Sequence, residues 1–577
     1  MGKEIVIVGA VAAGPKAACR LKRLKPDWNI TLVDQDSLIS YGGCGIPYYV
    51  SGDVSDASEL RATSFHVVRD EKFFEKAKGV HVRTRTRTTG IDRKRKVIEV
   101  ENLDSGQKQE LPYDKLMLAT GAKPFALPIP GADLDGVFTI ANLHKAVEIR
   151  KRIAQGEVGK AVVIGGGAIG IEMAEALKDL WGVETSLLEL APQLLPSIVD
   201  WPMASMLKKH LLDNGVDIYT GESATEIVGN DDGKVTAVKT ATRTLEADLV
   251  IVAVGVRPRS ELAKEAGLEI APRGGIRVDR RMRTSDPDIY AAGDCVASLS
   301  LVTGRDTFTP LGSLANRQGR VVADNMAGLA TQFKGVCGSF IMKAFDRCIA
   351  TTGISYEAAK AEGVDAEYAI TSPPDRAHFF PNQAVVILQM VFDKRTRKVL
   401  GVQGFAMMND SLSARIDTAA GLIAQGATIE DFADVEMAYA PPFSSAIDSI
   451  NAVAYAAENL CDGRFRQIKL DRFLAWLEDM TREPDWVALD IRHPAEAKPF
   501  IEKYGAEKWL FVQYEEMRAR YQEVPDEKTC IIICNAGTRS YEVQVFLESV
   551  GKTNNYVVGG GLNVVNRLDL DFDLDIK

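Results

Sequence analysis

The chain has 577 residues, 46% of them apolar and 26% charged, which is ordinary for a soluble globular protein and excludes a disordered, collagen-like or membrane-bundle chain. Its length suggests about four domains, and its formal net charge of −10 disfavours general nucleic-acid binding. No apolar run approaches the roughly 18 residues of a membrane span, and the chain opens on a strand pattern without a signal peptide. We therefore expect a cytoplasmic protein with no membrane partner and no nucleic-acid partner.

The first strand, turn and helix predict a nucleotide site. Ile5–Val8 is a continuous apolar run, typical of a buried parallel strand, and it leads into a turn with Gly9 and Gly14. Gly9 supplies the tight turn, Gly14 lets the next helix approach the strand, and free N–H groups at the helix start can hold a pyrophosphate. Asp34 ends the next strand 20 residues after Gly14, where an acid can bind a ribose, unless this is an ordinary βαβ unit with an incidental aspartate. The predicted binding residues are Gly9, Ala10, Val11, Ala12, Ala13, Gly14 and Asp34.

The first helix has a basic face. Lys16, Arg20 and Arg23 are spaced i, i+4 and i+7, so they lie on one side of the helix. This face is either simply solvated or the site of a second, phosphate-bearing ligand. A later run of arginines alternates with threonines, which predicts the exposed side of an antiparallel strand and not a nucleic-acid site: Arg83, Arg85 and Arg87.

Cys44 is a candidate reactive thiol. Three glycines surround it within residues 42–45, so the backbone can approach a planar ligand and the sulfur is unshielded. The positions five residues before and after it are Ile39 and Tyr49, which excludes a two-cysteine redox pair of that spacing. Cys44 must therefore work alone, either by exchange with an external sulfur or through an oxidised form.

A second nucleotide motif is complete. Ala161–Ile164 leads into G-x-G-x-x-G, formed by Gly165, Gly167 and Gly170, in a strand–turn–helix context. Glu189 ends the following strand, where it would bind a free ribose 2′-hydroxyl and repel a 2′-phosphate, and no basic residue follows it closely. The site should therefore prefer NADH to NADPH. Two dinucleotide folds imply two dinucleotides, most simply a flavin and a nicotinamide.

Two further strand ends support the flavin. Residues 113–118 predict a strand that ends in a small-residue turn, and residues 289–292 predict another that runs toward Asp294. Ligands of open α/β sheets collect at the carboxyl ends of the strands. The predicted binding residues here are Ala119, Thr120, Gly121 and Asp294.

These four motifs, in this order, resemble the flavin-dependent pyridine nucleotide–disulfide oxidoreductases over roughly residues 1–460. Ser40 and Cys44 resemble the single-cysteine branch, which contains coenzyme A-disulfide reductase, NADH-dependent persulfide reductase, NADH oxidase and NADH peroxidase. The segment Tyr439–Ser445 is similar to the coenzyme A branch. The resemblance implies FAD and NADH as cofactors and coenzyme A as a substrate or bound ligand. It places at a coenzyme A site Lys16, Arg20, Arg23, Ser40, Lys72 and Asn316.

The resemblance also implies a homodimer in which Tyr439 reaches the active cysteine of the partner subunit. No histidine lies between His378 and His493, so Tyr439 is the available proton donor, unless it only packs in an apolar interface. Two positions depart from the family pattern. A second family tyrosine is replaced around residues 379–381, and Ile447 stands where the family has a lysine.

A separate domain is predicted after residue 462. Two short buried strands are expected in it, at residues 487–492 and 530–534. The second ends at Cys534 in a short loop before a helix, where converging N–H groups, the helix dipole and Arg539 would stabilise a thiolate or persulfide. The C-x4-R spacing is shorter than the C-x5-R of protein phosphatases, which suits a sulfur atom better than a phosphate. With Asp490, Arg492 and the glycines at 559–561, the segment resembles a single-domain rhodanese. The alternative is an inactive docking module.

The sequence therefore predicts an α/β protein with two Rossmann-like dinucleotide-binding domains, an α+β dimerisation domain and an α/β rhodanese-like domain. The expected bounds are 1–150 and 255–329 for the FAD domain, 151–254 for the NAD domain, 330–462 for the dimerisation domain and 463–577 for the rhodanese-like domain.

The expected activity is NADH-driven, FAD-dependent reduction of persulfides, polysulfides or coenzyme A disulfides, with sulfane sulfur delivered by the fused rhodanese. The predicted catalytic residues are Cys44, Tyr439, Cys534 and Arg539, and no metal is expected. One alternative is an NADH oxidase or peroxidase in which Cys44 cycles through a sulfenic acid. Another is a sulfur-trafficking or redox-sensing protein whose flavin does not turn over.

Overall fold

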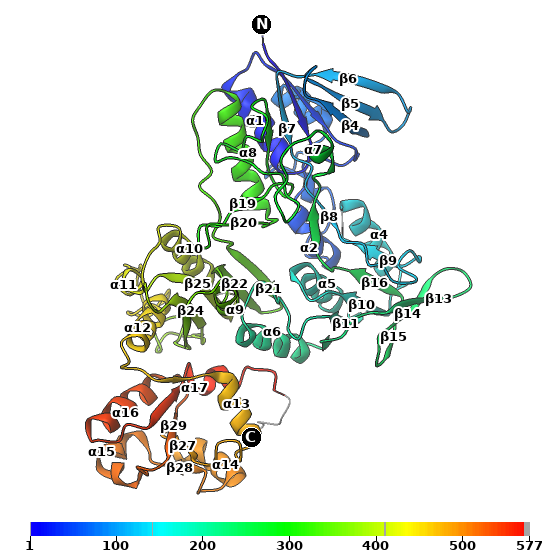
Figure 1. The fold of residues 1–577 in the computed structure, drawn as a ribbon. Helices are drawn as coiled ribbons and strands as arrows, with labels where there is room; N and C mark the ends of the chain where they lie inside the picture. The colour runs from blue at the N-terminus through cyan, green and yellow to red at the C-terminus, as the bar shows by residue number, and fades with distance from the viewer. Residues whose placement is uncertain (1, 141, 409–410, 571–577) are drawn as a thin grey trace. The chain divides into compact units, whose positions relative to one another are not determined.

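The computed structural model describes residues 2–140, 142–408 and 411–570. The chain divides into two compact units. Unit 1 comprises residues 1–190 and 216–336, and unit 2 comprises residues 191–215 and 337–577. Figure 1 gives the order of the helices and strands along the chain.

A parallel five-stranded sheet forms the first nucleotide domain of unit 1. Its strands, in spatial order, are β18 (Ile289–Ala291), β7 (Lys115–Leu118), β1 (Glu4–Val8), β2 (Asn29–Val33) and β3 (His81–Arg83). The helices of unit 1 are α1 (Ala13–Leu24), α2 (Ile46–Ser51), α3 (Glu71–Phe73), α4 (Leu143–Ala154), α5 (Ala168–Lys178), α7 (Glu261–Glu265) and α8 (Gly312–Met326). Helices α1 and α8 lie side by side (Figure 1), so closely that a Cβ on Gly319 would come 2.5 Å from the carbonyl oxygen of Ala13.

A three-stranded antiparallel sheet follows β3. Its strands are β4 (Thr86–Asp92), β5 (Val97–Asn102) and β6 (Lys108–Pro112). The three arginines that alternate with threonines are exposed, as expected. The single strand predicted through them is wrong, because Arg85 has a left-handed φ of 48° and separates β3 from β4.

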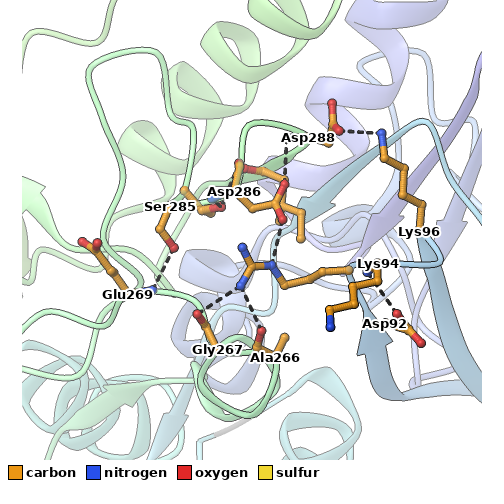
Figure 2. Close-up of polar contacts among 12 residues, drawn as sticks. Asp92, Lys94, Lys96, Ala266, Gly267, Glu269, Ser285, Asp286 and Asp288 are labelled. Carbon is orange, nitrogen blue, oxygen red and sulfur yellow. Dashed lines mark hydrogen bonds and ion pairs between the residues drawn. The ribbon is translucent and has the colours of Figure 1, made fainter.

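Ion pairs connect the antiparallel sheet β4–β6 to the segments around α7 and β18. Figure 2 shows Lys96, whose Nζ lies 2.6 Å from a carboxylate oxygen of Asp288. Arg93 Nε lies 2.7 Å from Asp286, and its guanidinium also donates to the carbonyl oxygen of Gly267, just beyond α7. These contacts hold β4 and α7 in fixed positions, and both elements line the nucleotide cavity described below.

The second nucleotide domain of unit 1 has its own parallel sheet. In spatial order its strands are β12 (Val216–Thr220), β11 (Glu184–Glu189), β10 (Lys160–Ile164), β16 (Leu249–Val252) and β9 (Val137–Thr139). Val162, Val163 and Leu187 are each 1% exposed or less, because both faces of the sheet are covered. A small antiparallel sheet adjoins it: β13 (Glu226–Gly229), β14 (Val235–Lys239) and β15 (Thr244–Glu246).

Unit 2 contains an antiparallel sheet with helices. Its strands, in order, are β21 (Phe340–Ala344), β22 (Arg347–Gly353), β25 (Val399–Met407), β24 (Ile387–Asp393) and β23 (Ala366–Thr371). Its helices are α6 (Trp201–Asp213), α9 (Tyr356–Ala361), α10 (Leu412–Ile423), α11 (Ile429–Ala433) and α12 (Ser449–Cys461). The buried carboxylate of Asp200, just before α6, accepts hydrogen bonds from Gln389 at 2.7 Å and Gln403 at 2.8 Å. These bonds explain why α6 belongs to unit 2 although it follows a strand of unit 1.

The last part of unit 2 is a parallel five-stranded sheet. Its strands, in order, are β26 (Gln467–Ile468), β30 (Asn555–Val558), β29 (Thr529–Ile533), β27 (Trp486–Asp490) and β28 (Trp509–Phe511). Its helices are α13 (Leu470–Glu478), α14 (Pro494–Tyr504), α15 (Met517–Arg520), α16 (Thr538–Ser549) and α17 (Gly561–Val565). Two nucleotide-type sheets, an antiparallel sheet with helices and this C-terminal parallel sheet confirm the predicted fold class.

Candidate active sites

The first glycine turn forms a close-packed cradle at the end of β1. Gly9 has a φ of +108°, and a Cβ there would lie 2.1 Å from the carbonyl oxygen of Ala119. A Cβ on Gly14 would lie 1.9 Å from the carbonyl oxygen of Gly9. Ala12 precedes α1 and has no polar side chain to cap it, so the N–H groups of the first turn remain available for a phosphate.

Asp34 lies at the end of β2, as predicted, beside a cavity of about 400 Å³. Its carboxylate accepts hydrogen bonds from the N–H of Ala10 at 2.7 Å and of Asp36 at 2.8 Å. Burial outweighs these bonds and raises its pKa. The cavity is lined by residues of β1, β2, β4 and α7, among them Gly9, Asp34, Thr88 and Leu262. A phosphate cradle beside a cavity of this size, with the Asp34 carboxylate in its lining, fits the adenosine half of FAD.

The other predicted flavin residues also occupy strand ends of this sheet. Thr120 donates through its hydroxyl to the carbonyl oxygen of Arg259 at 2.6 Å, which fixes the turn after β7. Asp294 follows β18, and burial raises its pKa to about 6. The adjacent Gly293 donates its N–H to Gln318 of α8 at 2.8 Å. The structure thus brings the residues predicted from three separated motifs, the first glycine turn with Asp34 and the two later strand ends, to one edge of the sheet.

The second glycine turn repeats the first. A Cβ on Gly165 would lie 2.5 Å from the carbonyl oxygen of Ala253, and one on Gly170 would lie 1.9 Å from the carbonyl oxygen of Gly165. Gly167 has nothing within 4 Å of its Cβ position, which leaves room for a ligand. Glu189 accepts the N–H of Gly166 at 2.6 Å, the same relation that Asp34 has to the first turn. These residues fit the pyrophosphate and ribose of a second dinucleotide.

Cys44 lies in a short helical turn of residues 43–45, immediately before α2. The loop is anchored by the N–H of Ser40, which donates to the carbonyl oxygen of Ala10 at 2.8 Å. A Cβ on Gly312, the first residue of α8, would lie 3.7 Å from the Cys44 sulfur. The start of a 15-residue helix therefore faces this thiol.

Two opposing effects act on the Cys44 thiol. The residue is exposed, yet neighbouring atoms shield its sulfur from water, and this shielding together with the charge of Glu172 raises the pKa of the thiol. A hydrogen bond from the N–H of Gly312 lowers the same pKa. The protein groups alone thus leave the thiol harder to ionise than an ordinary cysteine.

Glu172 of α5 was not predicted as a functional residue. Burial, and to a lesser extent the charge of Glu175, raises its pKa to about 7. Its charge acts on Cys44 and on Tyr48, whose pKa is raised to about 12, first by burial and next by Glu172. The only sequence signal was an acid two residues after Gly170 on a helix that starts at a nucleotide site. Glu172 can therefore hold or release a proton near neutral pH beside the reactive thiol.

We expect Glu172→Gln to lower the pKa of the Cys44 thiol. Above about pH 7 wild-type Glu172 is ionised and opposes the thiolate, whereas below that pH it is neutral and resembles glutamine. The variant should therefore react faster with iodoacetamide mainly above pH 7. Alkylation of Cys44, followed by mass spectrometry from pH 5 to 9, measures this. The exposed Glu157→Gln is the control, and identical pH profiles for wild type and Glu172→Gln would refute the coupling.

The predicted basic face of α1 is present, but its three residues differ in exposure and in their partners. Lys16 and Arg23 are exposed. Arg20 instead places its Nε 2.8 Å from the carboxylate of Asp324 in α8, which is 4% exposed. Arg20 thus neutralises a buried acid and helps to join α1 to α8, so its removal would affect stability as well as binding.

Other basic residues extend this face. The charges of Lys78, Arg23, Lys16 and Arg69 act on the half-buried Cys19 thiol, although burial dominates and raises its pKa. Lys78 and Arg69 were not predicted, because they lie far from α1 in the sequence. Three further residues were predicted at the coenzyme A site. Ser40 is buried and has a φ of 51°, whereas Lys72 is exposed in α3. Asn316 is exposed, and its side-chain N–H donates to the carbonyl oxygen of Gly312.

Tyr439 lies in an exposed apolar surface of unit 2. Its neighbours in the segment include Phe443, which is 73% exposed, and Ile447, which is 57% exposed. Phe379, in the segment 379–381 where the sequence departs from the family tyrosine, is 69% exposed. Exposed aromatic and aliphatic side chains of this size are typical of an interface.

A buried ion pair supports these apolar segments. Arg415 of α10 is 1% exposed and lies 3.0 Å from the carboxylate of Asp448, which precedes α12. It also donates to the carbonyl oxygen of Asp375 at 3.0 Å. Asp375 begins the stretch that leads to Phe379, and Asp448 ends the stretch that contains Tyr439. One guanidinium thus joins both apolar segments, which are also linked by the N–H of Ala377 donating to the carbonyl oxygen of Pro441 at 3.4 Å.

Cys534 lies at the end of β29, as predicted, at the base of the loop 534–537. The sulfur accepts the N–H of Gly537 at 3.1 Å, and α16 begins at the next residue. Arg539 lies in the first turn of α16, where its guanidinium is 6.0 Å from the ring centre of Tyr514. An N–H group directed at the sulfur and a helix start behind it suit a thiolate or a persulfide.

Charged groups beside this loop are held in fixed positions. The buried Asp490 accepts hydrogen bonds from Arg492 at 2.7 Å and from the indole of Trp509 at 3.0 Å. Glu496 accepts the side-chain N–H of Asn535 at 2.8 Å. Burial acts to raise the pKa of Glu496, but this bond and others, with the nearby arginine charges, lower it. Cys530, four residues earlier in β29, is buried, and burial raises its pKa to about 12.

In the part of the chain that the structure describes, no group of three or more histidine, cysteine, aspartate or glutamate residues could hold a metal ion. Among the same residues, no helix is both long and apolar enough to cross a bilayer.

The chain is similar to several known proteins over most of its length. A solved NAD-dependent persulfide reductase from A. fulgidus is 38% identical, with 97% of this chain and 99% of that chain covered and a TM-score of 0.90. The reduced CoADR-RHD of Bacillus anthracis is 32% identical, with 98% of each chain covered and a TM-score of 0.89. An NADH oxidase from Methanocaldococcus jannaschii is 33% identical over 449 residues, which is 78% of this chain and 97% of that protein.

Family profiles agree with these likenesses. The profile of the pyridine nucleotide-disulphide oxidoreductases matches residues 3–315, and that of their dimerisation domain matches residues 341–450. The family implies FAD and a nicotinamide nucleotide as cofactors, and the dimerisation domain supports a homodimer. The chain is therefore a flavin-dependent enzyme that belongs to the pyridine nucleotide-disulphide oxidoreductase family, as the sequence predicted.

Proposed function

We propose that this enzyme uses NADH to reduce persulfides, polysulfides or coenzyme A disulfides to thiols and sulfide. The observation that carries the proposal is the pair of cysteines. Cys44 is exposed at the start of α8 beside the flavin cradle, and Cys534 accepts an N–H bond in a loop suited to sulfane sulfur. The likeness to a persulfide reductase and to CoADR-RHD, each over nearly the whole chain, supports it.

The residues would act as follows. Glu189 and the second glycine turn hold NADH, and Asp34 and the first glycine turn hold FAD. FAD, when bound, passes two electrons from NADH to the sulfur chemistry. The Cys44 thiolate attacks a persulfide at the sulfur bound to carbon, which forms a mixed disulfide and releases hydrosulfide. Two electrons then restore the thiolate and free the thiol. Overall, a persulfide, NADH and a proton give a thiol, hydrogen sulfide and NAD⁺.

The leaving groups need protons. Glu172, with a pKa raised to about 7, is the acid of the same unit. In a homodimer, Tyr439 from the exposed apolar surface would reach the partner's Cys44 and donate from the other side. Arg539, in the first turn of α16 just after the Cys534 loop, would favour an anionic sulfur donor. In this proposal the FAD domain comprises residues 1–150 and 255–329, the NAD domain 151–254, the dimerisation domain 330–462 and the rhodanese-like domain 463–577.

Coenzyme A is the proposed ligand of the basic face on α1. Exposed Lys16 and Arg23, with Arg69 and Lys78 nearby, supply several cations for phosphate groups within one region of unit 1. Asn316 lies one turn into α8, whose first residue faces Cys44. A ligand that binds the cations through its phosphates could therefore carry its thiol toward Cys44.

We expect Arg23→Ala to raise the KM for coenzyme A-linked substrates about fivefold, because it removes one exposed cation, and to spare inorganic polysulfide. Arg23 is a better choice than Arg20, which is tied to buried Asp324. Steady-state NADH oxidation with both substrate classes measures the effect, and the exposed Arg281→Ala is the control. Equal losses for both classes would mean that the basic face is structural.

We expect Glu189→Ala combined with Leu190→Arg to shift the preference from NADH toward NADPH by about tenfold or more. The change removes the acid that repels a 2′-phosphate and places a cation at a neighbouring, 72% exposed position. The ratio of kcat/KM for the two nucleotides measures the shift, with Leu190→Arg alone as the control. An unchanged ratio would place the specificity elsewhere.

An NADH oxidase or peroxidase is the second candidate, favoured by the likeness to the Methanocaldococcus enzyme. NADH consumption compared in air, with peroxide and with anaerobic polysulfide decides between them. Full activity with polysulfide in the absence of oxygen supports the first proposal. A full rate sustained by oxygen alone would support the second.

A further inference from the structure

The two sheets of unit 2 meet at their edges. Strand β23 ends the antiparallel sheet, and β26 ends the parallel one. Gln467 of β26 donates its amide N–H to the carbonyl oxygen of Tyr368 at 3.1 Å and accepts the N–H of Ile370 at 3.3 Å. Lys469 forms an ion pair with Glu367 of β23. The rhodanese-like part, which comprises β26–β30 and α13–α17, is therefore joined to the antiparallel sheet by hydrogen bonds and an ion pair as well as by the chain itself.

Ser372 makes the next contact along this edge. It directly follows β23 and is 1% exposed. Its hydroxyl donates to the carbonyl oxygen of Gly560 at 2.7 Å and accepts the side-chain N–H of Asn563 at 3.3 Å. Both partners belong to the turn and short helix, residues 559–565, that follow β30. The residue thus reaches out of the antiparallel sheet into the rhodanese-like part.

The same turn supports the loop that carries Cys534. The N–H of Leu562 donates to the carbonyl oxygen of Cys534 at 3.0 Å, and the N–H of Asn563 donates to that of Asn535 at 2.8 Å. A Cβ on Gly561 would lie 2.5 Å from the carbonyl oxygen of Cys534. Turn and loop are in direct contact, so a shift of the turn must move the backbone of Cys534.

We propose that Ser372 is a positioning residue for the sulfur-transfer loop, so that Cys534 depends on a residue outside its own domain. This inference rests on the proposed sulfur-transfer role of Cys534. Without the hydroxyl, the buried carbonyl of Gly560 loses its partner and Asn563 loses its acceptor, and the turn is free to relax. The loop then loses its support, and the N–H of Gly537 is no longer fixed on the sulfur.

Ser372→Ala tests the proposal in the full-length holoenzyme. The control is Ser339→Ala, which removes a hydroxyl hydrogen-bonded to that of Thr352 in β22, toward the opposite edge of the same antiparallel sheet from β23. Hydrogen exchange should become faster in peptides that cover 534–538 and 559–565 in Ser372→Ala only. Unchanged exchange in these peptides would overturn the proposal.

The second readout is transfer of sulfur from thiosulfate to cyanide. The Cys534 thiolate takes the outer sulfur of thiosulfate, an S–S bond forms and sulfite leaves; cyanide then removes that sulfur as thiocyanate and restores the thiolate. We expect kcat/KM to fall about tenfold in Ser372→Ala, with flavin reduction by NADH unchanged. Ser372→Thr keeps the hydroxyl and should restore the rate, which a general loss of stability would not.

Asn563→Ala removes the side chain that donates to the Ser372 hydroxyl, so it tests the same contact if a Ser372 variant folds poorly. Since both residues act through one turn, their effects in the double variant should be less than the product of the single effects. Faster exchange with a wild-type transfer rate would overturn the proposal. If the wild type itself transfers no sulfur through Cys534, the proposed function fails, and the exchange measurement alone decides the positioning of the loop.

Discussion

Cys44→Ser should lower NADH-dependent reduction of every sulfur substrate by about 10³-fold or more, because a serine hydroxyl cannot form the mixed disulfide. Reduction of the flavin by NADH should survive, since the residues that hold the two nucleotides are untouched. Stopped-flow absorbance under anaerobic conditions separates the two half-reactions. Bleaching of the flavin should be normal, and its reoxidation by persulfide should be absent.

The control for this experiment is Cys461→Ser, which changes a partly buried thiol at the end of α12. It should leave both half-reactions at wild-type rates. A Cys44→Ser enzyme that still reduces persulfides would show that the sulfur substrate is reduced directly by the flavin. An enzyme whose flavin can no longer be reduced would show that Cys44 has a structural role in the nucleotide sites.

The nucleotide sites could be predicted from the sequence because they depend on short-range rules. Gly9 and Gly165 have positive φ values, and any side chain at Gly14 or Gly170 would overlap a carbonyl oxygen 1.9 Å away. Only glycine meets these conditions, so the pattern is visible in the letters. The buried strands are equally visible as short apolar runs bounded by turns.

Features that depend on distant parts of the chain were not predictable. Glu172 owes its pKa to burial by segments that meet only in the fold. Ser372 and Gly560 are 188 residues apart, and nothing around the serine indicates a partner. Similarly, Arg20 looked like one of three equivalent cations until the structure paired it with Asp324, 304 residues away. The local sequence pattern predicts the helices, the strands and the glycine turns of the cofactor sites. Side-chain contacts between distant elements become visible only in the three-dimensional structure.

The break at Arg85 involves a contact with a distant segment that the alternating pattern does not reveal. Three arginines and three threonines predict a continuous strand by periodicity alone. The structure places Arg85 in the left-handed region, where its N–H donates to the carbonyl oxygen of Asp36. This turn lets β3 complete the first sheet while β4 begins a different one. Alternation indicates which side chains are exposed, but it does not show which sheet a strand joins.

Cys534→Ser should remove activity with those donors that need the rhodanese-like part and spare those that do not. The Cys534 sulfur accepts an N–H bond in a loop that suits a persulfide, and Cys44 stands where electrons arrive from NADH. Two sites on one chain raise the effective concentration of each for the other. We therefore expect thiosulfate-type donors to lose about 10²-fold or more in NADH-linked rate, and small persulfides, which reach Cys44 directly, to retain nearly all of it.

NADH oxidation by wild type, Cys534→Ser and Cys530→Ser with several donors measures this. Cys530 is the matched control, because it is a buried thiol of the same strand that lies before the loop. If Cys534→Ser leaves every NADH-linked rate at the wild-type value, the rhodanese-like part serves separate partners and delivers nothing to Cys44. If it abolishes the reduction of small persulfides as well, sulfur must pass through Cys534 in every turnover, and direct access of substrates to Cys44 is wrong.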